Sequence, residues 1–346
     1  MSRGRRRWSG RQPEGVDAGE LPSELRELMR EESVPAWRSP TLATLTGEPF
    51  SDPDWIFERK LDGMRCLAFR DGGQIRLLSR NRQPLNGTYP EIVDALAAQE
   101  STRFVVDGEV VAFDGRRTSF SRLQRRLGIS DPRAARASGV AVFYYLFDLL
   151  HLDGKSTIAL PLVWRKRLLR NAFQFADPLR YSMHRVEDGN AAYRAACARG
   201  DEGVIAKSAN STYAGRRTSD WLKFKCVRDQ EFVVGGYTAP RGSRVGLGAL
   251  LVGYQDGPDL VYAGKVGTGF DTRTLRGLHD RLSAMEQDHP PFTKGLRGPA
   301  GARWVRPEMV VQLGFTEWTN EGKLRHPRYI GLRTDKNARD VVRETT

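Results

Sequence analysis

The sequence changes character at about residue 228, and this change limits the folds that the chain can adopt. Before it, apolar strand-like stretches such as "VAVFYYLFDLLHLDG" alternate with helical ones such as "PLVWRKRLLRNAFQF". After it come short strands punctuated by glycine, interrupted by one helical stretch, "DTRTLRGLHDRLSAMEQ". Several short strands with one helix are typical of a small barrel such as an OB-fold. We therefore predict an α+β chain with antiparallel sheets, in which a mixed domain at 36–228 precedes an OB-fold β-barrel at 229–346.

The charge of the chain suggests a class of partner. The 55 Lys and Arg residues outnumber the 42 Asp and Glu residues, which gives a net charge of +13. A polyanion such as nucleic acid fits this surplus, although an arginine-rich composition alone would produce the same value. We expect residues 1–35 to form an extension that is basic at its arginine-rich start. We expect residues 1–20 to be flexible, because they lack periodicity, and the leucines of 21–32 predict a short helix.

Other features concern the cellular compartment. Cys66, Cys197 and Cys226 are scattered and form no CxxC motif, so we expect neither a zinc site nor a disulfide framework. This cysteine usage favours a reducing cytoplasm. No apolar run approaches the roughly 18 residues of a membrane span, and the N-terminus lacks the apolar segment of a secretory signal. The sequence therefore predicts a cytoplasmic protein that works away from membranes.

The stretch "FERKLDGMRCLAFRDG" places Lys60 between acidic residues and ahead of an Asp62–Gly63 turn. A lysine amine attacks phosphorus only when it is neutral, and burial or a nearby cation lowers its pKa toward that state. A strand that ends in a tight turn would hold the amine at the rim of a pocket. The alternative is a solvated lysine before a hairpin, and this stretch alone does not separate the two. Because the chain has no P-loop motif, phosphate chemistry here needs a different apparatus.

Later stretches supply more candidates for the same chemistry. They are Glu109 in "DGE", Phe147 and Asp148 in "FDLL", Glu202 and Lys207 in "DEGVIAK", and Lys223 and Lys225 in "WLKFK". Lysines two apart in a strand share one face of the sheet. Each stretch alone has a plain structural explanation, such as a solvated carboxylate, a core aromatic or a wet strand face. Their order along the chain argues against coincidence.

In this order, the five stretches resemble the covalent nucleotidyltransferase superfamily of ATP-dependent DNA ligases, RNA ligases and mRNA capping enzymes. The segments "YYLFDLLHLDG", "EFVVGGYT" and "FTEWTNEGKLRHPRYIGLRTDK" look like the ligase domain of bacterial ligase D, the end-joining repair ligase. The resemblance covers about residues 40–345 and implies an adenylation domain followed by an OB-fold. Arg59 stands where a proline is usual and Met64 where an aromatic or aliphatic is common. Neither departure removes a group that the chemistry needs.

The resemblance implies three steps in one pocket. Lys60 attacks the α-phosphate of ATP and releases pyrophosphate, which gives lysyl-AMP. The AMP then moves to the 5′-phosphate at a break in duplex DNA, and a 3′-OH finally displaces it. Such transfers depend on placement and charge neutralisation more than on acid–base groups.

The resemblance also implies roles for individual residues. Lys60 and Asp62 would be catalytic, as would Arg333 and Lys336, which would come from the OB-fold on domain closure about a hinge at 226–231 and orient the pyrophosphate. Glu202 and Glu109 would bind Mg²⁺ or Mn²⁺. The expected nucleotide contacts are Glu58 and Arg59 to the adenine edge through backbone groups, Phe147 stacked on adenine, Arg65 and Glu109 to the ribose, Lys223 and Lys225 to the α-phosphate, Glu202 through the metal, and Arg80 to the nucleotide or the DNA 5′-phosphate.

The implied substrates are ATP and nicked or broken duplex DNA, and the implied process is repair by non-homologous end joining. Ku and an end-joining polymerase are candidate partners, although no Ku-binding motif is evident. We expect a monomer that associates with the bacterial nucleoid. Two alternatives stay open: an RNA ligase or capping enzyme, and a non-catalytic nucleic-acid binder. The stretch "TEWTNEGKLRHP" argues against the first, and the complete set of catalytic side chains argues against the second.

Overall fold

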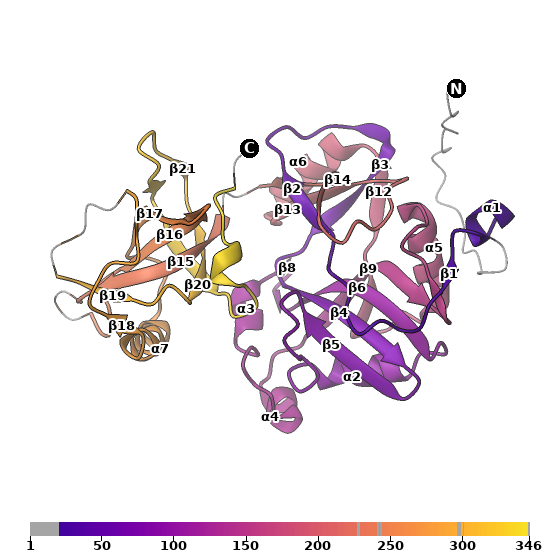
Figure 1. Cartoon of the computed structure of the whole chain (residues 1–346), viewed down its shortest axis with the longest axis horizontal. Helices are drawn as coiled ribbons and strands as arrows, with labels where there is room; N and C mark the ends of the chain where they lie inside the picture. The colour runs from indigo at the N-terminus through magenta and orange to yellow at the C-terminus, as the bar shows by residue number, and fades with distance from the viewer. Residues whose placement is uncertain are drawn as a thin grey trace. The chain divides into compact units, whose positions relative to one another are not determined.

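The computed structural model describes residues 21–226 and 229–344, apart from residues 241, 243, 296–298 and 300. The chain divides into two compact units, of which the first ends at Cys226 (Figure 1). The flexible extension predicted at 1–20 lies outside the described residues, as do residues 227 and 228 of the expected hinge. Among the helices of the described residues, none is long and apolar enough to cross a membrane.

The first unit contains two sheets, and the larger one, sheet A, forms most of its core. In spatial order sheet A contains β1 (Arg30–Glu31), β10 (Lys155–Ser156), β9 (Phe143–Leu152), β6 (Arg103–Val111), β4 (Met64–Asp71) and β5 (Gln74–Ser79), with β11 (Leu179–Tyr181) also beside β9. The pairs are antiparallel except β11 with β9. One face of sheet A packs on apolar side chains from the helices α2 (Pro90–Ala97), α3 (Phe120–Gln124) and α5 (Leu162–Ala172).

The second sheet of this unit, sheet B, contains β12 (His184–Glu187), β3 (Asp52–Lys60), β13 (Gly203–Ser208), β14 (Arg217–Lys225) and β2 (Leu42–Leu45) in that order. One face of sheet B packs on α6 (Gly189–Arg199) through apolar side chains that the strand register places on that face, namely Phe57, Val204, Leu222 and Phe224. The side chain of Asp188 caps the start of α6 by accepting a hydrogen bond from the backbone N–H of Ala191.

The two sheets meet in one apolar cluster, and this meeting places the candidate site. Phe69 and Phe147 come from sheet A, while Trp221 comes from sheet B. The "KLDG" turn lies where the chain leaves sheet B at Lys60 and enters sheet A at Met64. Lys60 therefore does not precede a hairpin, and it ends a strand at a crossing between sheets.

Three sequence-based expectations for the first unit need correction. The short helix expected within 21–32 is present only as α1, Ser23–Arg26, because Arg30 and Glu31 form β1 and pair with β10, and Leu21 is buried in the core. The pattern of "RFVVDGEVVAFDG" predicts two strands around a turn, but β6 runs unbroken from Arg103 to Val111, with an irregularity in its pairing to β9. Gly108 is needed for packing, since a methyl group there would lie 2.5 Å from the carbonyl oxygen of Tyr145.

The third correction concerns the cysteines, because Cys197 and Cys226 form a disulfide. Gly200 ends α6 in a left-handed conformation, with φ of 72°, and the chain returns along β13 and β14. This route brings the end of β14 next to the last turn of α6. The third cysteine, Cys66, is buried and free.

The second unit is a sheet of short strands with one described α-helix, α7 (Thr272–Ser283). Its order is β17 (Asp259–Val266), β16 (Leu250–Asp256), β15 (Asp229–Thr238), β19 (Ala302–Val305) and β18 (Glu286–Gln287), and β20 (Val310–Gly314) joins β15 to β23 (Arg328–Leu332). The first half of β15 pairs with β20 and its last residues with β19. No strand pairing among the described residues closes this sheet into a barrel, so the unit is OB-like.

The remaining elements are short. They are α4 (Pro132–Ala137), the hairpins β7 (Phe113–Asp114) with β8 (Arg117–Thr118) and β21 (Glu317–Trp318) with β22 (Leu324–Arg325), and the 3₁₀-helix η2 (Ala338–Asp340).

Candidate active site

The candidate site begins with the residues of sheet B that share a face with Lys60. Gly203 lies opposite Lys60 on β13, and Lys225 lies opposite Gly203 on β14. One step along, Lys223 lies in register with Ile205, which keeps it on the same face as Lys225. The Lys60 amine forms an ion pair with Glu202, and the two side chains are 16% and 12% exposed. We call Lys60, Glu202, Lys223 and Lys225 the Lys60 group.

Gly203 holds this group together. Its φ is +148°, and a methyl group at this position would lie 1.9 Å from the carbonyl oxygen of Phe224. Only glycine therefore lets β13 approach β14 here. On the other side of Gly203, the backbone N–H of Cys226 donates to the carbonyl oxygen of Glu202 at 3.0 Å. The position of Glu202 beside Lys60 thus depends on a local backbone arrangement that the "EG" dipeptide permits.

A second charged group lies on β3 two residues before Lys60. The Glu58 carboxylate accepts hydrogen bonds from Lys166 of α5 at 2.6 Å and Lys207 of β13 at 2.9 Å, and from the Ser182 hydroxyl at 3.2 Å. Glu58, Lys166 and Lys207 are each at most 3% exposed. We call these four residues the Glu58 cluster. It holds two cations for one carboxylate in a buried place.

The two lysines of the Glu58 cluster are electrostatically different. Burial raises the pKa of Glu58, but Lys166 and Lys207 outweigh it and hold that pKa at about 2. Burial lowers the pKa of Lys207 to about 8. The positive charge of Lys166 lowers this pKa further, and the negative charge of Glu58 compensates only in part. Burial also lowers the pKa of Lys166, but the interactions with Glu58 and Tyr181 outweigh burial, so this pKa is raised above its ordinary value. The charged form is therefore favoured more strongly at Lys166 than at Lys207.

Lys207 reaches from this cluster to the apolar cluster between the sheets. Its amine lies 4.2 Å from the centroid of the Phe147 ring and 4.1 Å from that of Trp221. Arg65 also lies over Phe147, at 4.6 Å. Phe147 is 7% exposed. A base stacked on Phe147 would have to replace at least one of these cation contacts, which differs from the open stacking surface expected from the sequence.

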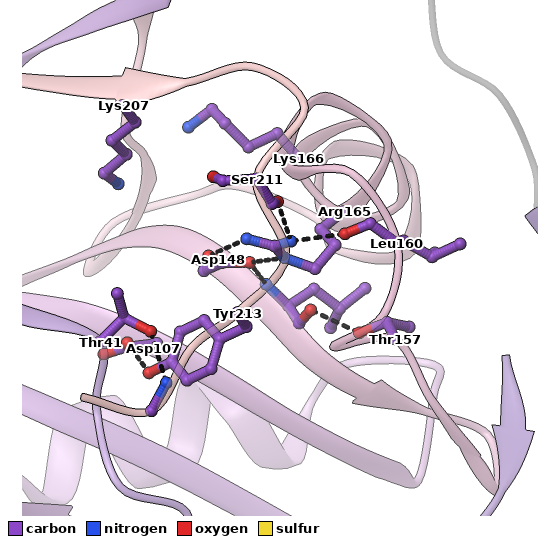
Figure 2. A network of polar contacts seen from close by, with 12 residues as sticks. Thr41, Asp107, Asp148, Thr157, Leu160, Arg165, Lys166, Lys207, Ser211 and Tyr213 are labelled. Atoms are coloured by element: carbon purple, nitrogen blue, oxygen red, sulfur yellow. Dashed lines mark hydrogen bonds and ion pairs between the residues drawn. The ribbon is translucent and has the colours of Figure 1, made fainter. Parts of the chain in front are cut away.

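Buried polar contacts fix the sheet A side of the site. Arg65 forms a two-bond ion pair with Asp107, which also accepts a 2.6 Å hydrogen bond from the Tyr213 hydroxyl. Nearby, Arg165 and Asp148 form an ion pair in which both side chains are fully buried. Figure 2 shows the Asp148–Arg165 pair together with Asp107, Tyr213, Lys166 and Lys207. In this structure the side chain of Arg65 is engaged by the protein, where the sequence predicted a ribose contact.

Other predicted residues lie at different places. The Asp62 carboxylate accepts a 2.9 Å hydrogen bond from the backbone N–H of Phe120 at the start of α3, so it fixes the turn after Lys60. The Arg59 side chain pairs with Asp201 at 2.7 Å, and strand alternation puts it on the opposite face from Lys60. Arg80 follows the last residue of β5 and is half-buried.

Glu109 lies on β6 in register with Arg65 of β4. A methyl group at Gly63 would lie 3.1 Å from its Cγ, so Glu109 flanks the turn that follows Lys60. Glu202 approaches Lys60 from sheet B. No group of three or more His, Cys, Asp or Glu side chains among the described residues could hold a metal ion by itself. A carboxylate on each side of this turn fits a cation of the Mg²⁺ kind, which uses one or two carboxylates together with substrate phosphates.

The two residues predicted in the second unit form contacts inside that unit. Arg333 is 8% exposed and makes a two-bond ion pair with Asp335, at 2.9 and 2.8 Å, and a hydrogen bond to Gln312. Lys336 pairs with Glu231 at 3.2 Å and is 20% exposed. Arg333 thus has a structural role here, whereas Lys336 is the more accessible of the two.

Sequence reasoning marked Lys207 as a candidate without giving it a role, and it did not mark Lys166 or Asp107. Lys207 and Asp107 belong to quoted stretches, "DEGVIAK" and "DGE", and strand alternation could have placed Lys207 on the Lys60 face. Lys166 had no such signal, because a lysine in "PLVWRKRLLR" reads as the wet side of a helix.

Comparisons with known proteins identify the family of this chain. Residues 40–225 match the family model described as ATP dependent DNA ligase domain, and residues 243–336 match the ATP dependent DNA ligase C terminal region. The chain therefore belongs to the ATP-dependent DNA ligases. Within this family it is similar to the ligase domain of bacterial LigD proteins.

Individual relatives support this position. The chain is 37% identical over 320 residues to the "Multifunctional non-homologous end joining protein LigD" of Pseudomonas aeruginosa, which covers 90% of this chain and 37% of that protein. It thus spans little more than a third of that relative's length. A "Probable DNA ligase" of Streptomyces coelicolor is 33% identical and covers 82% of this chain and 57% of its own length. The solved structure of "mycobacterial DNA ligase D complexed with ATP and MES" has 35% identity and a TM-score of 0.63, and covers 89% of this chain and 98% of its own.

Proposed function

We propose that this chain seals breaks in duplex DNA through a lysyl-AMP intermediate on Lys60. The observation that carries the proposal is the position of Lys60. It ends β3 at the crossing between sheets, beside Glu202 and on the same face as two further lysines. Membership of the ATP-dependent DNA ligases supplies the reaction class.

In this proposal the pocket has two ends. The Lys60 group forms the phosphate end, where Lys223 and Lys225 neutralise the α-phosphate while Lys60 attacks it. Phe147 and Lys207 form the base end. Arg65 and Glu109, which are paired on the adjacent strands β4 and β6, would contact the ribose. Glu58 and Arg59 contribute backbone groups near the base. Arg80 serves the nucleotide or the DNA 5′-phosphate.

Lys60 must lose a proton before it attacks. Its ion pair with Glu202 favours the charged amine, so this pair has to open during adenylation. We propose that Glu202 and Glu109 hold Mg²⁺ or Mn²⁺. When bound, such an ion neutralises phosphate charge and lowers the pKa of a neighbouring amine. Asp62 keeps Lys60 in place by anchoring the following turn to α3.

We propose that the second unit is an OB-fold barrel and that 36–228 and 229–346 are the domain bounds. Lys336 and Arg333 would orient pyrophosphate after closure about residues 226–231. For Arg333 this requires release from Asp335. The strand-rich unit and the basic charge of the chain support backbone-driven DNA binding.

We also propose that the reaction serves non-homologous end joining in the bacterial cytoplasm, on nicked or broken duplex DNA, with Ku and an end-joining polymerase as partners and the chain acting as a monomer. The support is the similarity to LigD proteins that carry end joining in their names.

The test is covalent labelling. With ATP labelled at the α-phosphate and Mg²⁺ or Mn²⁺, the wild-type chain should carry the label through denaturing electrophoresis. Lys60→Ala should carry none, and Lys155→Ala, at an exposed lysine of the same unit, should label normally. Labelling of Lys60→Ala would overturn the assignment. Labelling by GTP instead of ATP would favour a capping enzyme, and a label that never reaches nicked DNA would contradict ligation.

A further inference from the structure

The Glu58 cluster contains two lysines, although one would be enough to balance the charge of its single carboxylate. Lys166 donates to Oε1 of Glu58 at 2.6 Å and to the carbonyl oxygen of Ser182 at 3.0 Å, and lies 4.7 Å from the centroid of the Tyr181 ring. Lys207 donates to Oε2 of Glu58 at 2.9 Å. The extra lysine is costly to bury, since each buried cation loses its hydration. Such an arrangement calls for a functional explanation.

Lys166 and Lys207 use their donors differently. An ammonium group has three N–H donors and no acceptor. Lys166 directs its contacts at the carboxylate, a carbonyl oxygen and an aromatic face, all within the protein. Lys207 has Glu58 as a hydrogen-bond partner, and its amine then faces the rings of Phe147 and Trp221. Lys207 therefore has donor capacity directed toward the apolar cluster between the sheets.

We propose that Lys166 is a positioning residue that sets the base preference of the site, because by engaging Oε1 of Glu58 it leaves Lys207 as a hydrogen-bond donor for the nucleobase. This inference rests on the function proposed above, in which Phe147 and Lys207 form the base end. Lys166 itself touches no nucleotide and acts through Glu58.

The chemistry of the bases explains the preference. Ring nitrogen N1 of adenine carries a lone pair and accepts a hydrogen bond, whereas N1 of guanine and hypoxanthine carries a hydrogen. A lysine ammonium can only donate. Lys207 therefore favours adenine in a dry pocket, where an unpaired N–H opposite another N–H costs the most.

Without Lys166, Lys207 would no longer be available as a hydrogen-bond donor for the base. Glu58 would have Lys207 as its one cation in the cluster, and both carboxylate oxygens would attract the Lys207 donors. The amine would then turn toward Glu58 and away from the base. The lowered pKa of Lys207 agrees with this arrangement, because Glu58 balances the charge of Lys207 only in part.

The test compares ATP with 1-deaza-ATP, which keeps the 6-amino group and lacks the N1 acceptor. The measurement is the rate of lysyl-nucleotide formation at subsaturating nucleotide. The wild-type chain should prefer ATP by about 10- to 100-fold, the range for a hydrogen bond to a charged group. In Lys166→Gln, which keeps a donor for Glu58 but removes the charge, the preference should fall below about threefold. Lys166→Arg should restore most of it.

A matched control separates positioning from stability. Arg126 is another buried cation of this unit, 1% exposed and paired with Glu91, with none of its contacts in the site. Arg126→Gln should lower stability and leave the ratio between the two nucleotides unchanged. A ratio in Lys166→Gln equal to that of the wild type would overturn the inference, as would a wild-type chain that uses both nucleotides equally. The second measurement needs no variant, so the inference stays testable if Lys166→Gln does not fold. Absence of any lysyl-nucleotide in the wild type would contradict the proposed function itself.

Discussion

Two lysine–glutamate pairs lie on one face of the same sheet, and they differ in how firmly they are held. Glu58 and Lys60 are two residues apart on β3. Glu58 is fully enclosed and accepts three hydrogen bonds, two of them from lysines. Lys60 and Glu202 remain partly exposed. Under the proposed function, this difference means that one end of the pocket is built before the nucleotide arrives, whereas the other has to exchange its partners during the reaction.

The largest expected effect is on the stable end. Glu58→Ala leaves two buried lysines without their carboxylate, and breaking a buried ion pair from one side costs about 3–5 kcal/mol. The free energy of unfolding, measured by urea denaturation, should fall by that amount. Arg136→Ala, which removes an exposed ion pair with Asp94, should change it by less than about 1 kcal/mol. Equal losses in the two variants would end the distinction between the two kinds of pair.

Acid should act on the same end. The pKa of Glu58 is lowered from 4.5 to about 2, because Lys166 and Lys207 outweigh the effect of burial. Its contribution is therefore complete above pH 4.5 and is lost as the pH falls toward 2. The shift corresponds to about 3 kcal/mol of unfolding free energy. Denaturation between pH 5 and 2 should show this slope in the wild type and a shallower one in Glu58→Gln; identical slopes would mean that Glu58 has an ordinary pKa.

At the exchanging end, chemistry should suffer more than stability. Glu202→Ala removes the group that contacts Lys60 and is proposed to bind the metal, so lysyl-AMP formation should fall by about 100-fold or more at saturating ATP. Its unfolding free energy should fall less than that of Glu58→Ala. Glu187→Ala, an exposed carboxylate of the same sheet, is the control. Near-normal adenylation in Glu202→Ala would make Glu202 a solvated strand carboxylate.

The smallest effect extends the comparison to the second unit. Lys336→Ala should slow lysyl-AMP formation by about tenfold, as expected for one lost charged contact, and should spare the sealing of a nick that already carries a 5′-adenylate. Lys294→Ala, at an exposed lysine of the same unit, should affect neither step. Arg333→Ala should in addition destabilise the unit, because it leaves Asp335 buried without its cation. Equal losses of Lys336→Ala on both substrates would point to DNA binding instead.

Much of the fold follows from sequence patterns. Alternation placed Lys223 and Lys225 on one face, and the register with β13 confirms it. The two glycines of "FRDGGQIRL" predict a turn between two strands, and Gly72 and Gly73 do lie between β4 and β5. Periodicity fails where a short stretch is decided by tertiary contacts. Leu21 and Leu25 pack on the core without forming a full helix, and Arg30 and Glu31 pair with a distant strand edge.

The site itself is less predictable for a physical reason. A motif shows which side chains are available, but their partners are set by the fold. Glu58 and Lys166 are 108 residues apart, and no local pattern connects them. Nearness in the sequence does not reveal the partner either. Arg333 and Asp335 are two residues apart in "GLRTDK", and the motif did not indicate that they form an ion pair. Chemistry was therefore easier to predict than its electrostatic control.

The disulfide between Cys197 and Cys226 turns part of the first unit into a covalent ring. That ring encloses Glu202, Lys207, Lys223 and Lys225, which are most of the charged groups that sheet B offers to the nucleotide. A protease that cuts the exposed stretch near Arg216 would therefore leave two fragments that still travel as one chain until a dithiol separates them. The groups proposed to bind ATP would thus stay tethered to one another even after the backbone between them had been severed.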